Sequence, residues 1–77
     1  MISGDQVRGA RAMLKLTVAE LSTAAGIAPN TIVRVEAGKS VNTGTLAAIQ
    51  KALETSGVIF VPENGEGPGV RLRKAAS

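Results

Sequence analysis

A helix start, a helix stop and a second helix start follow one another closely in the first half of this chain. The segment Thr17-Val-Ala-Glu20 has the pattern of a capping box, in which the Thr and Glu side chains each accept a backbone N–H of the first turn. Gly26 suits the left-handed conformation that ends a helix, and Pro29 suits the first turn of the next helix, where its missing N–H would be unpaired anyway. The spacing therefore predicts two short helices that meet at a tight corner over Ala25-Gly26-Ile27-Ala28.

The segments around this corner also have helical periodicity. A capping box at Ser3-Gly-Asp-Gln6 predicts a helix over residues 4–15. The helix after the corner is expected to end at Gly38, and a last helix to run from near Thr43 to Gly57. Four helices are thus predicted. The side chains expected to face the core are Val7, Ala10, Leu14, Leu21, Ala24, Ile32, Val35, Leu46, Ile49 and Leu53.

The chain changes character after the fourth helix. Val58-Ile-Phe-Val61 is β-branched and aromatic, Pro62 to Gly69 is rich in turn residues, and Val70-Arg-Leu-Arg73 alternates between apolar and charged side chains. This pattern predicts a β-hairpin. The expected fold is mostly α, with a helical domain over residues 1–57, a hairpin extension over residues 58–73 and a disordered tail over residues 74–77.

The composition narrows the possible function classes. The 77 residues include no Cys and no His, so the commonest nucleophiles, general bases and transition-metal ligands are missing. The six acidic residues are scattered along the chain rather than clustered. We therefore expect that the protein is not an enzyme and binds no metal or other cofactor. The net charge of +3 permits binding to nucleic acid without proving it.

Neither a membrane span nor a signal peptide is expected. No apolar run reaches the ~18 residues that a spanning helix needs. The opening segment Met1-Ile-Ser-Gly-Asp5 has neither a basic region nor an apolar stretch. We expect a cytoplasmic location without membrane contact.

The stretch from Arg11 to Ser40 resembles the lambda-repressor and Cro-like family, often called the XRE family. The resemblance covers about residues 4–57 and implies a four-helix, lambda-repressor-like helix-turn-helix domain that regulates transcription. Two positions depart from the family pattern: Val18 stands where Gln is usual, and Ala28 where Ser is usual. The missing Gln at position 18 suggests weaker or differently anchored DNA binding or, in the extreme, a degenerate helix-turn-helix that no longer binds DNA. The motifs that carry the resemblance are Leu16-Thr17, Glu20-Leu21, Ala24 with Gly26-Ile27, and Ile32 with Glu36-Ala-Gly-Lys39.

The third helix is expected to enter the major groove, because that is the place of the second helix of such a motif. Asn can pair with adenine, Arg with guanine, and Thr or Val can contact a thymine methyl group. Hydroxyls, an ammonium group and free N–H groups at helix starts can hold phosphates. Thr17 and Thr43 are also sufficiently explained as helix caps, and capping and phosphate contact can coexist. The predicted base-reading residues are Pro29, Asn30, Thr31, Val33 and Arg34, and the predicted phosphate contacts are Thr17, Lys39, Ser40 and Thr43.

Other charged residues are expected to serve the scaffold. The family resemblance implies an ion pair between Arg11 and Glu36, which would link the first helix to the end of the third. Arg71, Arg73 and Lys74 are interpreted as a solvated strand face, with contact to a neighbouring phosphate as the less favoured alternative.

The expected function is a dimeric repressor of its own or a neighbouring operon that binds double-stranded DNA at a pseudo-palindromic operator. A helical body of this size offers little surface to a hairpin, so the hairpin is expected to pair with its copy in a homodimer. Two alternatives stay open. In the first, the hairpin folds onto its own helices and the dimer forms through the fourth helix. In the second, the protein is an antitoxin or antiactivator that uses a degenerate helix-turn-helix fold to bind a partner protein. The predicted dimer contacts are Val58, Ile59, Phe60, Val61, Val70 and Leu72.

Overall fold

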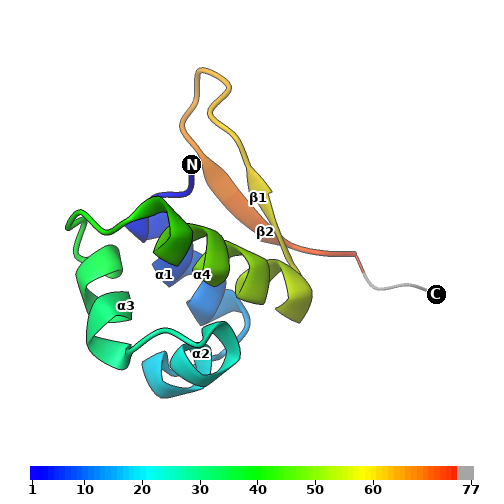
Figure 1. The fold of residues 1–77 in the computed structure, drawn as a ribbon. Coiled ribbons are helices and arrows are strands. Elements are labelled where there is room, and N and C mark those ends of the chain that lie inside the picture. Colours follow the sequence, from blue (N-terminus) through cyan, green and yellow to red (C-terminus); the bar gives the residue numbers. More distant parts are fainter. Residues whose placement is uncertain (75–77) are drawn as a thin grey trace.

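A computed structural model describes residues 1–74 and confirms the mostly α fold, with four helices followed by an antiparallel hairpin (Figure 1). The prediction of a disordered tail falls, apart from Lys74, outside the described residues. The elements are α1 (Gly4–Met13), α2 (Val18–Ala25), α3 (Pro29–Glu36), α4 (Thr43–Ser56), β1 (Val58–Val61) and β2 (Gly69–Leu72).

Helix α1 begins at the predicted capping box but ends earlier than predicted. The Ser3 hydroxyl accepts the N–H of Gln6, and the Gln6 side chain accepts the N–H of Ser3 at 2.8 Å. Lys15 adopts a left-handed conformation with φ 58°, which an α-helix does not tolerate. The helix therefore stops at Met13, and the N–H of Leu16 donates to the carbonyl of Arg11 instead.

The corner between α2 and α3 has the predicted form, with one change in the core. Thr17 and Glu20 form the capping box, and Gly26 ends α2 in the left-handed region at φ 68°. Ala24, however, is exposed, and Ala25 packs against the core instead. Residues three and four positions beyond Leu21 lie on opposite flanks of its helical face, and the core lies on the flank of the later one.

Helix α4 begins at Thr43, as predicted, but its N-cap is Asn42 and not Thr43. The side-chain oxygen of Asn42 accepts the N–H of Thr45 at 2.8 Å, so Asn42 is the N-cap and Thr43 is the first helical residue. The helix ends at Gly57, as predicted, with φ 119°. Leu46 packs against the core but is only partly buried. Among residues 1–74, the fully buried large side chains are Leu21, Ile32, Ile49, Leu53, Val7 and Val58.

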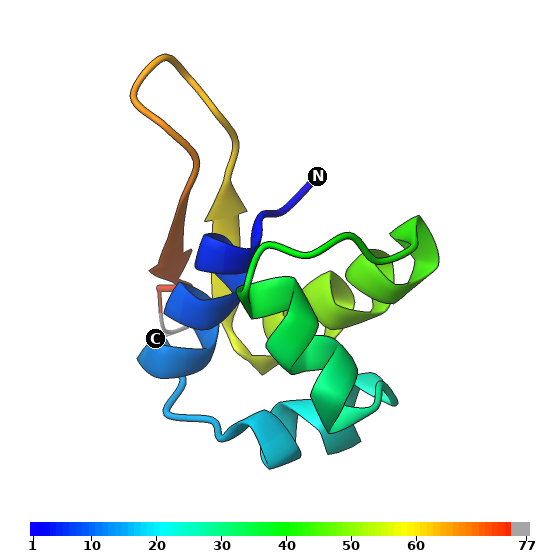
Figure 2. The same ribbon diagram turned by 90° about the vertical axis from the view of Figure 1, so that its left-hand side faces the viewer.

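The hairpin packs on the helices of its own chain. Strand β2 contacts α1 and strand β1 contacts α4, as the two views of the ribbon show (Figures 1 and 2). Val58 is completely buried in the core. The premise that the helices leave little surface for the hairpin is therefore wrong, and Val58 has no exposed surface with which to contact a second copy.

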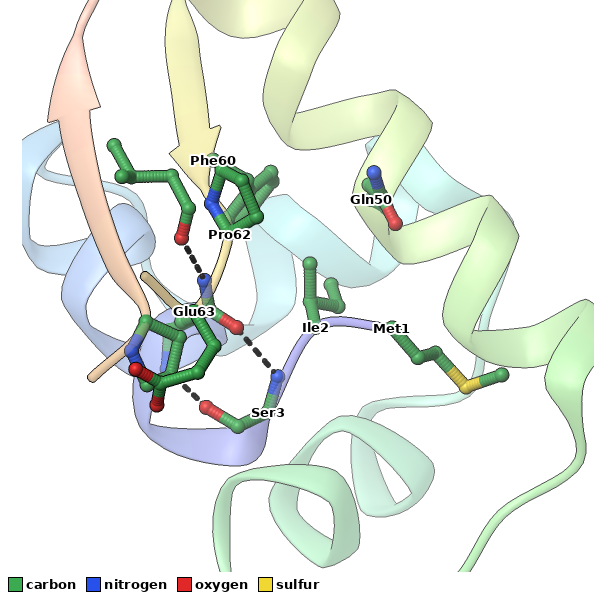
Figure 3. A pocket seen from close by; sticks show the side chains of 10 residues that line it. Met1, Ile2, Ser3, Gln50, Phe60, Pro62 and Glu63 are labelled. Atoms are coloured by element: carbon green, nitrogen blue, oxygen red, sulfur yellow. Dashed lines mark hydrogen bonds between the residues drawn. The ribbon is translucent and has the colours of Figure 1, made fainter. Parts of the chain in front are cut away.

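Gln6 fastens this hairpin to the start of α1. Its amide nitrogen lies 3.4 Å from the carbonyl oxygen of Val61, while its side-chain oxygen accepts the N–H of Ser3 (Figure 3). The same nitrogen donates to the carbonyl of Gly69 at 2.9 Å. Gln6 is the buried polar residue of the described chain, and the two bonds of its amide nitrogen join the start of α1 to the C-terminal hairpin. Around it lies an open pocket of about 490 Å³, whose walls include Ile2, Phe60 and Pro62.

Candidate nucleic-acid interface

The tight corner presents one face of α3 to solvent. Ile32 and Val35 are buried and fix the inner face of α3 against the core. The turn itself is held by Ser22, whose hydroxyl donates to the carbonyl of Ile27 and whose carbonyl accepts the N–H of Gly26 at 2.9 Å. The outer face of α3 is consequently a rigid, exposed surface (Figure 2).

The predicted base-reading residues share this outer surface to different degrees. Pro29, Asn30 and Arg34 are exposed, and Val33 is 52% exposed although it is a large apolar residue. Thr31 is partly buried. The first turn of α3 thus offers an amide and a hydroxyl group, and the next turn offers an apolar side chain beside a guanidinium group.

Arg34 lies in the last turn of α3 and points toward the loop that follows. One of its terminal nitrogens lies 3.4 Å from the carbonyl oxygen of Ser40. The backbone N–H of Lys39 donates to the carbonyl of Arg34 at 3.0 Å. This arrangement brings the predicted base-reading Arg34 together with the two predicted phosphate contacts Lys39 and Ser40, both of which are exposed.

The other two predicted phosphate contacts lie at helix starts. Thr17 is exposed, and its hydroxyl oxygen accepts the N–H of Glu20 at 3.0 Å, which leaves the hydroxyl proton free to donate. Thr43 is exposed at the first position of α4 and does not cap the helix. Asn42, which caps it, was not predicted, although Asn is as good a cap as Ser or Asp.

Arg11 and Glu36 form a bidentate ion pair between α1 and the end of α3. The Nε and Nη2 atoms of Arg11 donate to the Glu36 carboxylate at 2.8 and 2.9 Å, and Nη1 donates to the carbonyl of Leu16 at 3.1 Å. The side chains are 22% and 10% exposed. The hydrogen bond and the charge of Glu36 raise the pKa of Arg11 against the opposing effect of burial.

The two departures from the family pattern have visible structural consequences. Val18 is partly buried and packs against the core, so it presents no donor at the start of α2. Ala28 is the N-cap of α3 and makes no side-chain hydrogen bond to the first turn. The start of α3 therefore depends on its packing and on Pro29 rather than on a cap.

Gly4 is a positioning residue that the sequence analysis missed. A Cβ atom at this position would lie 2.1 Å from the carbonyl oxygen of Val35, so α1 approaches the end of α3 more closely than any side chain allows. The sequence signal was a Gly inside the first turn of a capped helix, where the residue has no conformational advantage. Gly4 and the Arg11 ion pair together join α1 to α3.

A family model for the helix-turn-helix matches residues 7–60, well over half of the chain. The chain belongs to the helix-turn-helix family. This match agrees with the resemblance to Cro-like regulators, and the family is one of DNA-binding regulatory domains. No curated protein matches the chain significantly.

Two further findings concern other kinds of site. Within residues 1–74, no helix has both the length and the apolar character that crossing a membrane requires. In the same residues, no three His, Cys, Asp or Glu side chains come together as possible metal ligands.

Proposed function

We propose that this helix-turn-helix protein binds a specific double-stranded DNA operator and represses transcription of its own or a neighbouring operon. The observation that carries this proposal is the rigid outer face of α3, on which Asn30, Val33 and Arg34 are exposed beside the phosphate-binding loop at Lys39 and Ser40. Side chains on the first turns of such a helix reach base edges, and groups in the flanking loops hold phosphates. A regulator of this kind works where the DNA is, in the cytoplasm.

The assignment of contacts follows from this placement. Pro29, Asn30 and Thr31 lie in the first turn of α3 and would approach the bases first, with Val33 and Arg34 following one turn later. Thr17 and Thr43 lie at the starts of α2 and α4, where a phosphate would meet free backbone N–H groups. The Arg11–Glu36 pair stays outside the contact surface and holds α3 in place.

We also propose that the protein acts as a two-fold homodimer on a pseudo-palindromic operator. A half-site contacted by one short helix carries too little sequence information for a genome, and doubling it raises the specificity. The two copies of α3 would then lie ~34 Å apart, one turn of DNA. The hairpin residues that remain accessible for this contact are Ile59, Phe60, Val61, Val70 and Leu72.

A gel-shift titration against the DNA upstream of the gene tests the proposal. We expect specific binding that a scrambled duplex does not compete away, and Asn30→Ala with Arg34→Ala should abolish the preference. Ala24→Ser, an exposed change on α2 away from the proposed contacts, is the matched control and should bind normally. Equal binding to operator and scrambled DNA by the unmodified protein would contradict the proposal.

The residues at the starts of α2 and α3 support a second candidate function. Because Val18 and Ala28 offer no polar group there, the protein has fewer DNA anchors than its family usually has. An antitoxin or antiactivator that binds a partner protein through the hairpin or Val33 would tolerate this loss. Absence of DNA binding combined with copurification of one partner protein from the native host would favour it.

A further inference from the structure

The loop that joins β1 to β2 contains an exposed Asn64-Gly65 pair. In both views of the ribbon this loop projects away from the helices, so water reaches it freely (Figures 1 and 2). An asparagine can lose its side-chain amide when the backbone nitrogen of the next residue attacks the side-chain carbonyl carbon. Glycine has no Cβ atom to obstruct this attack, whereas a β-branched residue carries two heavy atoms there. Asn30 and Asn42, the other asparagines of the chain, are each followed by a Thr.

The side chain of Asn64 is folded back over the backbone of Gly65. Its carbonyl oxygen accepts the N–H of Glu66 at 3.2 Å, and the ring closed by this hydrogen bond includes the nitrogen of Gly65. The bond also draws electron density away from the carbonyl carbon that would be attacked. Gly65 has φ 100°, and a Cβ atom built there would meet nothing within 4 Å. Neighbouring groups therefore leave room for a ring to close at this position.

The other two asparagines lie at helix starts, where the same reaction would disrupt hydrogen bonds. Asn30 is in the first turn of α3, and the N–H that follows it, that of Thr31, donates to the carbonyl of Ala28 at 3.0 Å. Asn42 is the N-cap of α4, and its side-chain oxygen accepts the N–H of Thr45 at 2.8 Å. Asn64 is thus the asparagine whose neighbourhood opposes the reaction least.

One group nevertheless restrains the attacking nitrogen. The N–H of Gly65 donates to Oε1 of Glu63 at 2.8 Å, and the same oxygen accepts the N–H of Gly67 at 2.7 Å. These backbone bonds, that of Gly67 first, lower the pKa of Glu63, so its side chain is a carboxylate at neutral pH. The nitrogen of Gly65 must give up its proton in order to attack. Negative charge that develops on this nitrogen is destabilised by the carboxylate beside it.

We propose that Asn64 is a site of spontaneous deamidation and that Glu63 slows this reaction. The nitrogen of Gly65 forms a bond to Cγ of Asn64, and the bond between Cγ and the side-chain nitrogen breaks. Ammonia leaves with the proton of the Gly65 amide, and a succinimide ring remains. Water then opens the ring at either of its two carbonyl groups, which gives an aspartate or an isoaspartyl residue. The reaction requires neither DNA nor a partner protein, so it does not depend on the proposed function.

Both products change the loop and leave the helices as they are. Each product adds a carboxylate to a loop that already carries Glu63 and Glu66, and so lowers the net charge of +3 by one. In the isoaspartyl product the backbone runs through Cβ and Cγ of residue 64. The nitrogen of Gly65 is then displaced from the Glu63 carboxylate, and the hydrogen bond between them is lost.

Incubation of the full chain at a mildly alkaline pH, followed by peptide mapping with mass spectrometry, tests the site. We expect the mass gain that replacement of –NH2 by –OH produces to occur at Asn64, before any gain at Asn30 or Asn42 in the same sample. The aspartyl and isoaspartyl peptides should separate by chromatography. Asn64→Gln should abolish the early mass gain, because attack on the longer side chain would have to close a larger ring.

Two variants test the role of Glu63. Glu63→Gln keeps an oxygen that accepts the Gly65 N–H but removes the charge, and should speed deamidation at least about threefold. Glu66→Gln removes the same charge from the same loop without touching the Gly65 nitrogen, and should leave the rate nearly unchanged. Circular dichroism of both variants should match that of the unmodified protein, because the substituted side chains are exposed.

A synthetic peptide of residues 62–69 sets the time scale of the incubation, since it has the same sequence without the fold. The proposal is overturned if Asn64 of the Glu63→Gln variant is still intact when this peptide has reacted completely. It is also overturned if Asn30 or Asn42 reacts first, if Glu63→Gln reacts no faster than the unmodified protein, or if Glu66→Gln speeds the reaction equally.

Discussion

At the scale of single residues, Arg34 is the predicted base-reading residue whose side chain contacts the loop after α3. It lies in the last turn of α3 and points toward the Ser40 carbonyl, next to Lys39. The guanidinium group is long enough to leave this position for a guanine. We expect Arg34→Ala to remove discrimination at one base pair of each half-site, at a cost of about 1–3 kcal/mol. Lys39→Ala should weaken binding to all sequences about equally and reduce the salt dependence.

Binding isotherms on operator and scrambled duplexes at several salt concentrations separate these effects. An Arg34→Ala variant that keeps full discrimination but shows a weaker salt dependence would make Arg34 a phosphate contact instead of a base contact.

The ion pair between Arg11 and Glu36 makes a separate prediction about stability. Glu36→Ala leaves the Arg11 guanidinium partly buried with only the Leu16 carbonyl as a partner, so the free energy of unfolding should fall by about 2 kcal/mol. Urea denaturation measures this change, and Glu36→Gln, which keeps a hydrogen-bond acceptor, should lose less. Operator affinity should fall only as far as the folded fraction falls. Unchanged stability with lost binding would place Glu36 at the DNA instead.

At the scale of elements, α3 is the helix whose start is least secured. Ala28 stands at its N-cap with φ −58° and ψ 141°, close to the conformation of a capping residue, and offers no acceptor. We expect Ala28→Ser to raise the free energy of unfolding by about 1 kcal/mol, because a hydroxyl oxygen can accept a free N–H of the first turn. Thermal unfolding checks this, with Ala24→Ser on the exposed side of α2 as the control. Equal effects of the two substitutions would show that capping is not the cause.

The loop of the hairpin carries a pH-dependent cap. Glu63 accepts the N–H groups of Gly65 and Gly67 at 2.8 and 2.7 Å, and these backbone bonds, that of Gly67 first, lower the pKa of its carboxyl group. A lowered folded pKa means that the contribution to stability is present above the unfolded pKa and is lost as pH falls through the folded pKa. We expect the Gly65 and Gly67 amide resonances to titrate together with Glu63, below the ordinary range of a Glu.

NMR titration of two variants tests the assignment of this cap. Glu63→Gln should abolish the shift of both glycine resonances with pH, and Glu66→Gln should leave it unchanged. Titration of the two glycines that persists in Glu63→Gln would refute the assignment.

The elements also show where sequence reasoning was sufficient. The capping boxes at Ser3 and Thr17 and the stop at Gly57 depend on neighbours within one turn, so their pattern was legible in the chain. The exposure of Ala24 depends on which flank of α2 meets α4, which no local pattern encodes. The amide of Gln6 could be recognised as a cap, but its bond to the Gly69 carbonyl joins residues that only the tertiary fold brings together.

The features of the candidate site also divide into those that the local sequence predicts and those that only the tertiary fold determines. The exposed positions of α3 follow from the 3.6-residue period, since the buried Ile32 and Val35 fix the opposite face. The contact of Arg34 with Ser40 depends on the path of a loop, and the closeness of Gly4 to Val35 depends on the packing of α1 against α3. Long-range approach of two backbones has no sequence signal beyond the glycine itself.

At the scale of the whole molecule, the hairpin completes the core of its own chain. Val58 is fully buried, and Phe60 and Val70 pack against the same core. A fully buried Val contributes about 2 kcal/mol, and a domain of this size has only about 3–5 kcal/mol of net stability.

Truncation after Gly57 should therefore leave the helices largely unfolded at room temperature, and not merely monomeric. Circular dichroism with urea titration measures this outcome. A full-length double variant, Met13→Gln with Leu72→Gln, is the control, because it changes two exposed apolar side chains while keeping the buried residues. If the truncated chain unfolds with the same free energy as the full chain, the hairpin is only an appendage and its core contacts carry no stability.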